Sequence, residues 1–89
     1  MSASTGDYES SLDPKAKAIL DLLRANPAKS YTVMDLHGAV YSEAEKSAHL
    51  TTGLKEVFGQ IQGWLNEFKE RGYVKSKLIS TSFYYSAAS

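Results

Sequence analysis

The chain has 89 residues, with ten basic and ten acidic side chains and hence a formal net charge of zero. A chain of this length forms one domain, and its hydrophobic and aromatic content is that of a globular protein rather than a disordered one. It has no cysteine, which excludes disulfides and thiolate metal sites. It also has no apolar run of the roughly 18 residues that a membrane helix needs, so we expect a soluble, cytoplasmic protein.

Residues 1–12 are predicted to form a disordered, acidic tail. They contain Asp7 and Glu9 but no lysine or arginine, and their serine-rich composition has little apolar surface to bury. The acidic bias continues to Asp13. The predicted folded domain spans residues 13–87. The ten basic and seven acidic residues that follow Asp13 give this part of the chain a net charge of +3. Such a charge is compatible with a nucleic-acid surface without demonstrating one.

A first helix is predicted to begin at Asp13 and to end by Asn26. Asp13 is a favourable N-cap, and Pro14 fits the first helical position because no backbone N–H donor is needed there. The residue before Pro27 is pushed out of the helical conformation, which ends the helix. Apolar residues recur with the spacing of one buried helical face, namely at Ala16, Ile19, Leu20 and Leu23.

A second helix is predicted to begin after Thr32, whose side chain can form a variant of the capping box with Asp35. One face of this helix carries Val33, Leu36, His37, Val40 and Tyr41. The end of the helix stays open, because residues 42–47 combine a high helix propensity with a capping pattern of their own, formed by Ser42 and Glu45. This segment either continues the second helix or begins another, and the next predicted break is Thr-Thr-Gly at residues 51–53.

A third, longer helix is predicted from Leu54 to Arg71, with Gly72 as its stop because glycine readily adopts a positive φ. Its buried face is formed by Leu54, Val57, Phe58, Ile61, Leu65 and Phe68. Its exposed face carries Thr52, Glu56, Gly59, Gly63, Asn66 and Glu70, flanked by Lys55 and Gln62. The two glycines either permit the close approach of another backbone or are tolerated without a role. Trp64, at the margin of the buried face, is either a core residue or an anchor for a protein partner.

A β-hairpin is predicted to follow Gly72, with its turn at residues 80–81. This turn pairs Leu78 with Phe83, Ser76 with Tyr85 and Val74 with Ala87, and the alternation of side chains directs this set toward the core. The other face carries Tyr73, Lys75, Lys77, Ile79 and Tyr84, with no acidic residue from Gly72 to the end of the chain. Lysines among tyrosines suit contact with a phosphate backbone, whereas lysines on an edge strand also prevent aggregation, and both interpretations stay open.

The order of these elements, with a Gly-Tyr-Val junction at residues 72–74 between the last helix and the hairpin, resembles the winged-helix DNA-binding domain. The resemblance implies an α+β fold, a small three-helix bundle with a C-terminal hairpin wing, in which Tyr31 adds a short third strand. It also implies a transcriptional regulator that places its third helix in the major groove of double-stranded DNA. Two-fold pairing on a palindromic site would make it a homodimer. The implied nucleic-acid-binding residues are Thr52, Lys55, Gln62, Asn66, Tyr73, Lys75, Lys77 and Tyr84.

The alternative is a winged-helix protein-interaction module or complex subunit that does not bind DNA. The zero net charge and the acidic residues of the third helix favour this alternative, with Gly59, Gly63 and Trp64 as the candidate partner interface. We expect no enzyme activity, cofactor, small-molecule substrate or metal. The sequence has neither a nucleophile motif nor a glycine-rich phosphate loop, and His37 and His49 are not accompanied by cysteines or by a spaced carboxylate cluster.

Overall fold

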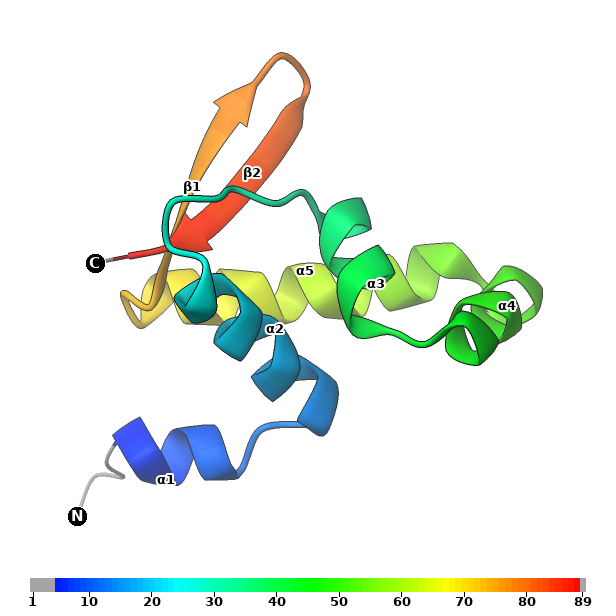
Figure 1. Ribbon diagram of the computed structural model, residues 1–89, viewed down its shortest axis with the longest axis horizontal. Helices are drawn as coiled ribbons and strands as arrows, with labels where there is room; N and C mark the ends of the chain where they lie inside the picture. Colours follow the sequence, from blue (N-terminus) through cyan, green and yellow to red (C-terminus); the bar gives the residue numbers. More distant parts are fainter. Residues whose placement is uncertain (1–4, 89) are drawn as a thin grey trace.

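The computed structural model describes residues 5–88, so the predictions made for residues 1–4 lie outside the described part of the chain. The described residues form five helices and a two-stranded antiparallel hairpin, which rises from one side of the packed helices (Figure 1). The elements are α1 (Thr5–Ser10), α2 (Pro14–Ala25), α3 (Val33–Val40), α4 (Glu43–Thr52), α5 (Leu54–Glu70), β1 (Val74–Ile79) and β2 (Ser82–Ala87). The predicted α+β class is confirmed, but there are two helices more than the predicted three. None of the described helices is both long and apolar enough to cross a lipid bilayer.

Helix α1 occupies part of the segment for which the sequence predicts a disordered tail. The difference arises because Tyr8 and Leu12, one helical turn apart, pack against the edge of the core. The guanidinium of Arg71 lies 3.4 Å from the centre of the Tyr8 ring. Arg24 donates a hydrogen bond of 2.7 Å to the Glu9 carboxylate. Although the segment is polar overall, Tyr8, Leu12 and Glu9 therefore attach it to the domain.

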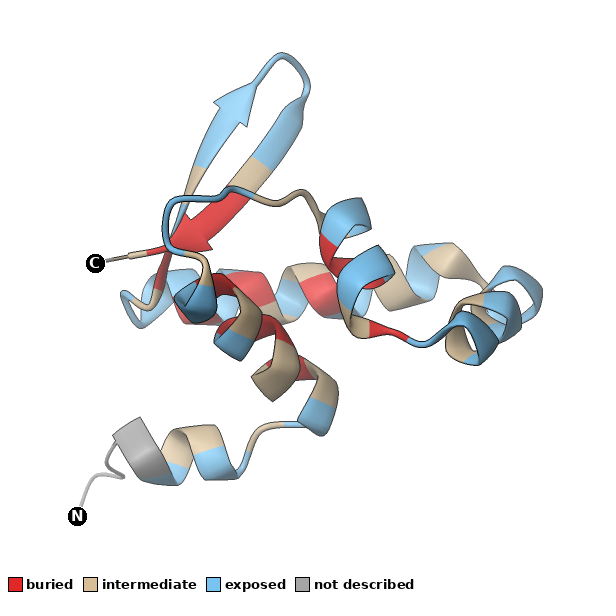
Figure 2. Ribbon diagram, viewed as in Figure 1, coloured by how far each residue is buried: buried red, intermediate tan, exposed pale blue. Residues whose placement is uncertain are grey.

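Helix α2 begins and ends as predicted. The backbone N–H of Lys15 donates to the Asp13 carboxylate at 2.8 Å, and Asn26 is the C-cap before Pro27. The four apolar residues of the predicted stripe, Ala16, Ile19, Leu20 and Leu23, are all wholly buried. They belong to the single core cluster of the domain, in which α2 packs against α3 and the base of the hairpin (Figure 2).

Helices α3 and α4 are separate, so residues 42–47 begin a new helix rather than continue the second one. Each begins with a reciprocal capping box, Thr32 with Asp35 and Ser42 with Glu45. Between them Tyr41 has an extended backbone, with φ of −92° and ψ of 144°, so the helical path is interrupted. No residue of α4 is buried. This helix therefore depends on its cap and on polar contacts rather than on core packing.

Helix α5 follows directly after Gly53, whose φ of 121° allows the chain to turn between the two helices. Its second half carries the core residues Ile61, Leu65 and Phe68, which are wholly buried. In its first half the predicted core residues Leu54, Val57 and Phe58 are only partly buried. The helix ends at Glu70, and Gly72 has the positive φ, 80°, that the sequence predicts.

The hairpin has the predicted register, with Leu78 opposite Phe83, Lys77 opposite Tyr84 and Val74 opposite Ala87. Tyr31 pairs with Tyr85 through two backbone hydrogen bonds of 2.8 Å, so β2 lies between Tyr31 and β1.

The predicted core face of the hairpin is buried only at its base. Val74, Tyr85 and Ala87 are buried there, whereas Leu78 is 58% exposed and Phe83 is 52% exposed. The prediction that all of these residues face the core is therefore wrong at the distal end. The physical reason is visible in Figure 2, where the outer half of the hairpin extends beyond the helices and has nothing to pack against.

Candidate nucleic-acid interface

One face of the hairpin forms a groove that is bordered by lysines, called the lysine groove below. Lys75 and Lys77 on β1 and Tyr84 on β2 line one wall. The opposite wall is the connector between α2 and α3, at Pro27, Ala28 and Ser30. The groove has a volume of about 370 Å³. The predicted grouping of Lys75, Lys77 and Tyr84 on a single face is therefore present in the structure.

Within the described part of the chain, the lysines of this groove form no ion pair. Five of the basic residues described are paired with carboxylates: Lys15, Lys17, Arg24, Lys46 and Arg71. Lys75 and Lys77, and Lys29 in the connector, have no carboxylate within ion-pair distance among residues 5–88, and all three are exposed. No acidic residue lies between Asn26 and Met34 or after Glu70. The groove therefore carries uncompensated positive charge, which attracts anions.

The other face of the hairpin takes part in a second groove, called the apolar groove below. Its lining residues come from α3, α5 and β2, and all of them are uncharged: Thr32, Val33, Met34, Phe58, Gln62, Ser82 and Phe83. The volume of this groove is about 240 Å³. Because side chains alternate along a strand, Lys77 and Leu78 lie on opposite faces of the hairpin. In the structure, Lys75 and Lys77 therefore lie on the opposite face of the hairpin from the apolar groove, to which α5 contributes.

The predicted contact residues of α5 are not brought together with the lysines. Gln62 donates hydrogen bonds to Asn66 at 3.1 Å and to the Tyr85 hydroxyl at 2.5 Å, so it connects α5 to β2. Lys55 is exposed in the first turn of α5. Thr52 ends α4, and its hydroxyl donates to the carbonyl of Ala48 at 3.1 Å.

Tyr73 does not belong to the lysine groove either. Its ring lies 6.0 Å from the ring of Tyr8 and 6.4 Å from that of Phe68, between α1 and the core. The guanidinium of Arg24 lies 5.2 Å from its centre. Tyr73 precedes the first residue of β1. The strand alternation that was expected to place it on the same face as Lys75 and Lys77 therefore does not apply to it.

The residues predicted as a partner interface lie on two sides of α5. Gly59 and Gly63 are exposed, and a Cβ atom added at either position would meet no other atom within 4 Å. Neither position therefore requires glycine for packing within the chain. Trp64 is partly buried and packs against the core, which agrees with its interpretation as a core residue.

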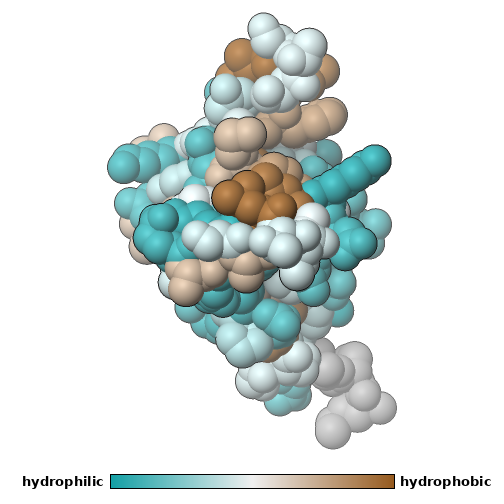
Figure 3. All heavy atoms as spheres, turned by 90° about the vertical axis from the view of Figure 1, so that its right-hand side faces the viewer, coloured by the Kyte–Doolittle hydropathy of each residue, from teal (hydrophilic) through white to brown (hydrophobic). Residues whose placement is uncertain are grey.

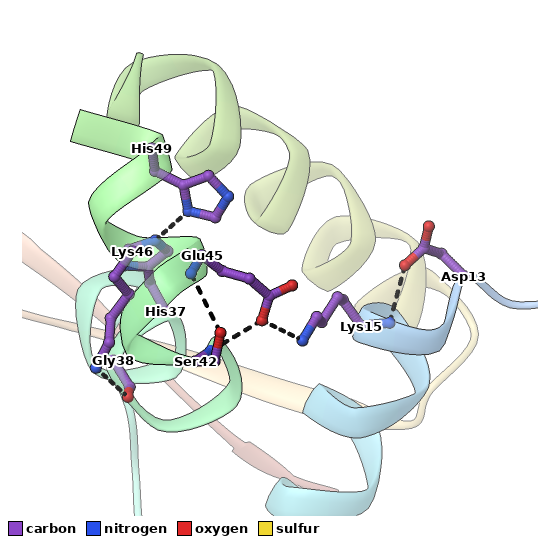
Figure 4. Close-up of polar contacts among 8 residues, drawn as sticks. All are labelled: Asp13, Lys15, His37, Gly38, Ser42, Glu45, Lys46 and His49. Carbon is purple, nitrogen blue, oxygen red and sulfur yellow. Dashed lines mark hydrogen bonds and ion pairs between the residues drawn. The ribbon is translucent and has the colours of Figure 1, made fainter. Parts of the chain in front are cut away.

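Sequence reasoning missed a histidine contact between α3 and α4. His37 Nε2 and His49 Nδ1 lie 2.9 Å apart, so that one ring donates a hydrogen bond to the other (Figure 4). Tyr41 and Phe58 pack against the His37 ring. Burial, and then the nearby His49 and Lys46, lower the pKa of His37. The only signal in the sequence was the position of His37 on the apolar face of its helix.

A second polar contact joins α4 to α2. Lys15 Nζ lies 2.7 Å from Glu45 Oε1, and the same carboxylate oxygen accepts the backbone N–H of Ser42 at 2.9 Å (Figure 4). These hydrogen bonds lower the pKa of Glu45 to about 2. Among residues 5–88, no group of three or more histidines and carboxylates is placed to hold a metal ion.

The described chain is thus an α+β domain whose hairpin has one basic and one apolar face. In comparisons with known proteins, no family model, no curated protein and no solved structure matches the chain. Its function is therefore inferred from these two faces.

Proposed function

We propose that this chain is a winged-helix protein that binds double-stranded DNA and acts as a transcriptional regulator. In this interpretation α2, α3 and α5 are the three helices of the fold, α4 is an additional helix before the third, and the hairpin is the wing. The order of these elements and the backbone pairing of Tyr31 with Tyr85 support the assignment.

The observation that carries the proposal is the uncompensated charge of the lysine groove. Lys75 and Lys77 are two residues apart on β1, hence about 7 Å apart. Lys29 lies in the connector between Ala28 and Ser30, which line the opposite wall, although Lys29 itself does not line the groove. No carboxylate pairs with any of these three lysines within residues 5–88. An ammonium group that is free of a protein carboxylate can replace counterions on phosphate. Tyr84 adds a hydroxyl beside Lys77, and tyrosine hydroxyls are common phosphate contacts.

The contacts that we propose are mainly to the backbone of DNA. Helix α5 has few free groups of the kind that read base edges, since Gln62 is hydrogen-bonded to Tyr85. Its exposed surface also includes Glu56, Glu67 and Glu70, which disfavour phosphate nearby. Binding through the lysine groove should therefore depend strongly on salt and weakly on sequence.

Fluorescence anisotropy with a labelled duplex, at salt concentrations from about 50 to 200 mM, tests the proposal. We expect micromolar binding at the lowest salt, and the double variant Lys75→Ala, Lys77→Ala should flatten the salt slope by about one to two units on every duplex. A control with the same change in net charge is Lys17→Ala, Lys69→Ala, since both of these lysines lie on helices outside the groove. This control should leave most of the slope in place. Equal effects of the two double variants, or no binding at the lowest salt, would rule out the lysine groove as a DNA site.

A second candidate function is a protein-interaction module that does not bind DNA. The apolar groove favours it, because exposed apolar side chains next to a recess are typical of protein interfaces. Capture of a partner protein by the wild-type chain but not by a Met34→Gln variant would support this candidate.

A further inference from the structure

The apolar groove is bordered by large side chains that nothing in the described chain covers. Met34 is 68% exposed at the start of α3, and Leu78 and Phe83 are 58% and 52% exposed as a cross-strand pair on the hairpin. Figure 3 shows one hydrophobic patch at the hairpin tip and another over the helices below, with paler residues between them and hydrophilic residues beside them. Helix α1 lies at the opposite end of the molecule from the hairpin tip, so it does not cover this surface (Figure 1).

We propose that a second copy of this chain occupies the apolar groove, so that the protein forms a two-fold symmetric dimer through the inner face of its hairpin. A two-fold interface requires one surface to be complementary to itself. Here the projecting side chain of Phe83 and the recess at Val33 and Phe58 belong to the same surface. In a two-fold pair, Phe83 of each copy enters the recess of the other.

The charges on the hairpin agree with this mode of association. All residues that line the apolar groove are uncharged, so two identical surfaces meet without repulsion. The free edge of the sheet is β1, which carries Lys75 and Lys77, and lysines on an edge strand disfavour pairing between edges. Face-to-face packing places these lysines on the outer side. The dimer leaves both lysine grooves open. Its formation does not depend on nucleic acid.

The exposed area indicates a weak dimer. An aromatic side chain offers roughly 150–250 Å², so that the half-exposed Phe83 supplies about 100 Å². Met34 and Leu78 are exposed to a similar extent, and the three side chains together supply about 600 Å² in a pair of chains. A specific interface buries about 1,000 Å² or more, so the walls of the groove must supply the remainder. We therefore expect a concentration-dependent equilibrium of monomer and dimer.

Sedimentation equilibrium of the full chain without nucleic acid, from about 10 µM to about 1 mM, tests the proposal. The mean mass should rise from the monomer value of 9.8 kDa toward twice that value. Phe83→Ser and, separately, Met34→Gln should each raise the dissociation constant at least about tenfold. Ile79→Ser is the matched control, because Ile79 is 48% exposed at the same hairpin tip, alternates with Leu78 along β1 and does not line the apolar groove. It should change the dissociation constant by less than about twofold.

Circular dichroism checks that each variant stays folded. Because Phe83 and Met34 lie on different elements, one variant still tests the proposal if the other fails to fold. A mass of 9.8 kDa at every concentration would overturn the proposal. A dimer that both Phe83→Ser and Met34→Gln leave intact would overturn it equally. Because no DNA is present, neither result bears on the lysine groove.

Discussion

His37 on α3 and His49 on α4 are joined by a hydrogen bond of 2.9 Å between Nε2 of the first and Nδ1 of the second. This contact matters because no residue of α4 is buried, so the helix has no core packing of its own. Lys46 adds a hydrogen bond of 3.1 Å to the carbonyl of Gly38, and Glu45 adds its ion pair with Lys15. Helix α4 is thus held by its cap and by polar side chains.

The histidine pair should make the stability of the protein decrease below neutral pH. The folded state keeps His37 neutral because burial, His49 and Lys46 lower its pKa. The unfolded chain takes up a proton near the ordinary value of about 6.5. The unfolded state therefore binds more protons as the pH falls below this value, and the free energy of unfolding decreases. Urea unfolding at about pH 7.5 and about pH 5.5 measures the effect.

His37→Phe is the control for this prediction, since phenylalanine keeps an aromatic ring at the site and cannot titrate. The decrease in stability between the two pH values should be smaller in this variant than in the wild-type chain. An equal decrease in both would show that His37 does not contribute.

Removal of the cap of α4 should destabilise that helix selectively. Ser42 Oγ accepts the backbone N–H of Glu45 at 3.1 Å, and replacing an N-cap serine with alanine costs about 1 kcal/mol. Because α4 buries no residue, we expect Ser42→Ala to speed amide hydrogen exchange in α4 more than in α5. Ser47→Ala, within the same helix and exposed, should leave exchange unchanged or slow it. Faster exchange of equal size in α4 and α5 would contradict the view of α4 as a separate unit.

The two glycines on the exposed side of α5 should be replaceable without loss of stability. An added Cβ at Gly59 or Gly63 meets no atom within 4 Å, and alanine is favoured over glycine inside a helix by about 1 kcal/mol. Each substitution to alanine should therefore raise the melting temperature by roughly 4–8 °C for a domain of this size. Gly72→Ala is the contrasting variant, because its φ of 80° strains any other residue and should lower the melting temperature.

Alanine at both Gly59 and Gly63 also tests whether these glycines permit the close approach of another backbone or are tolerated without a role. If another backbone approaches α5 closely, the double variant Gly59→Ala, Gly63→Ala should bind DNA or a protein partner more weakly than the wild-type chain. Unchanged binding would indicate that Gly59 and Gly63 are tolerated without a role.

Local signals in the sequence account for both boundaries of α2, the starts of α3 and α4, the stop of α5 and the register of the hairpin, whereas they leave the end of α3 open. Asp13 and Thr32 hydrogen-bond to backbone groups two or three residues away, so their effect is independent of the rest of the fold. The turn at residues 80–81 determines the strand pairing for the same reason. The grouping of Lys75, Lys77 and Tyr84 also follows from alternation along the two strands.

Only the tertiary structure determines how elements that are distant in the chain lie relative to one another. Tyr73 packs under α1, Gln62 bonds to Tyr85, and the outer half of the hairpin has no helix to cover Leu78 and Phe83. Periodicity indicates which residues share a face of one element, but it contains no information on how far a neighbouring element extends. The lysines and α5 therefore lie on different sides of the hairpin because of the way the hairpin packs on the helices, which no local pattern specifies.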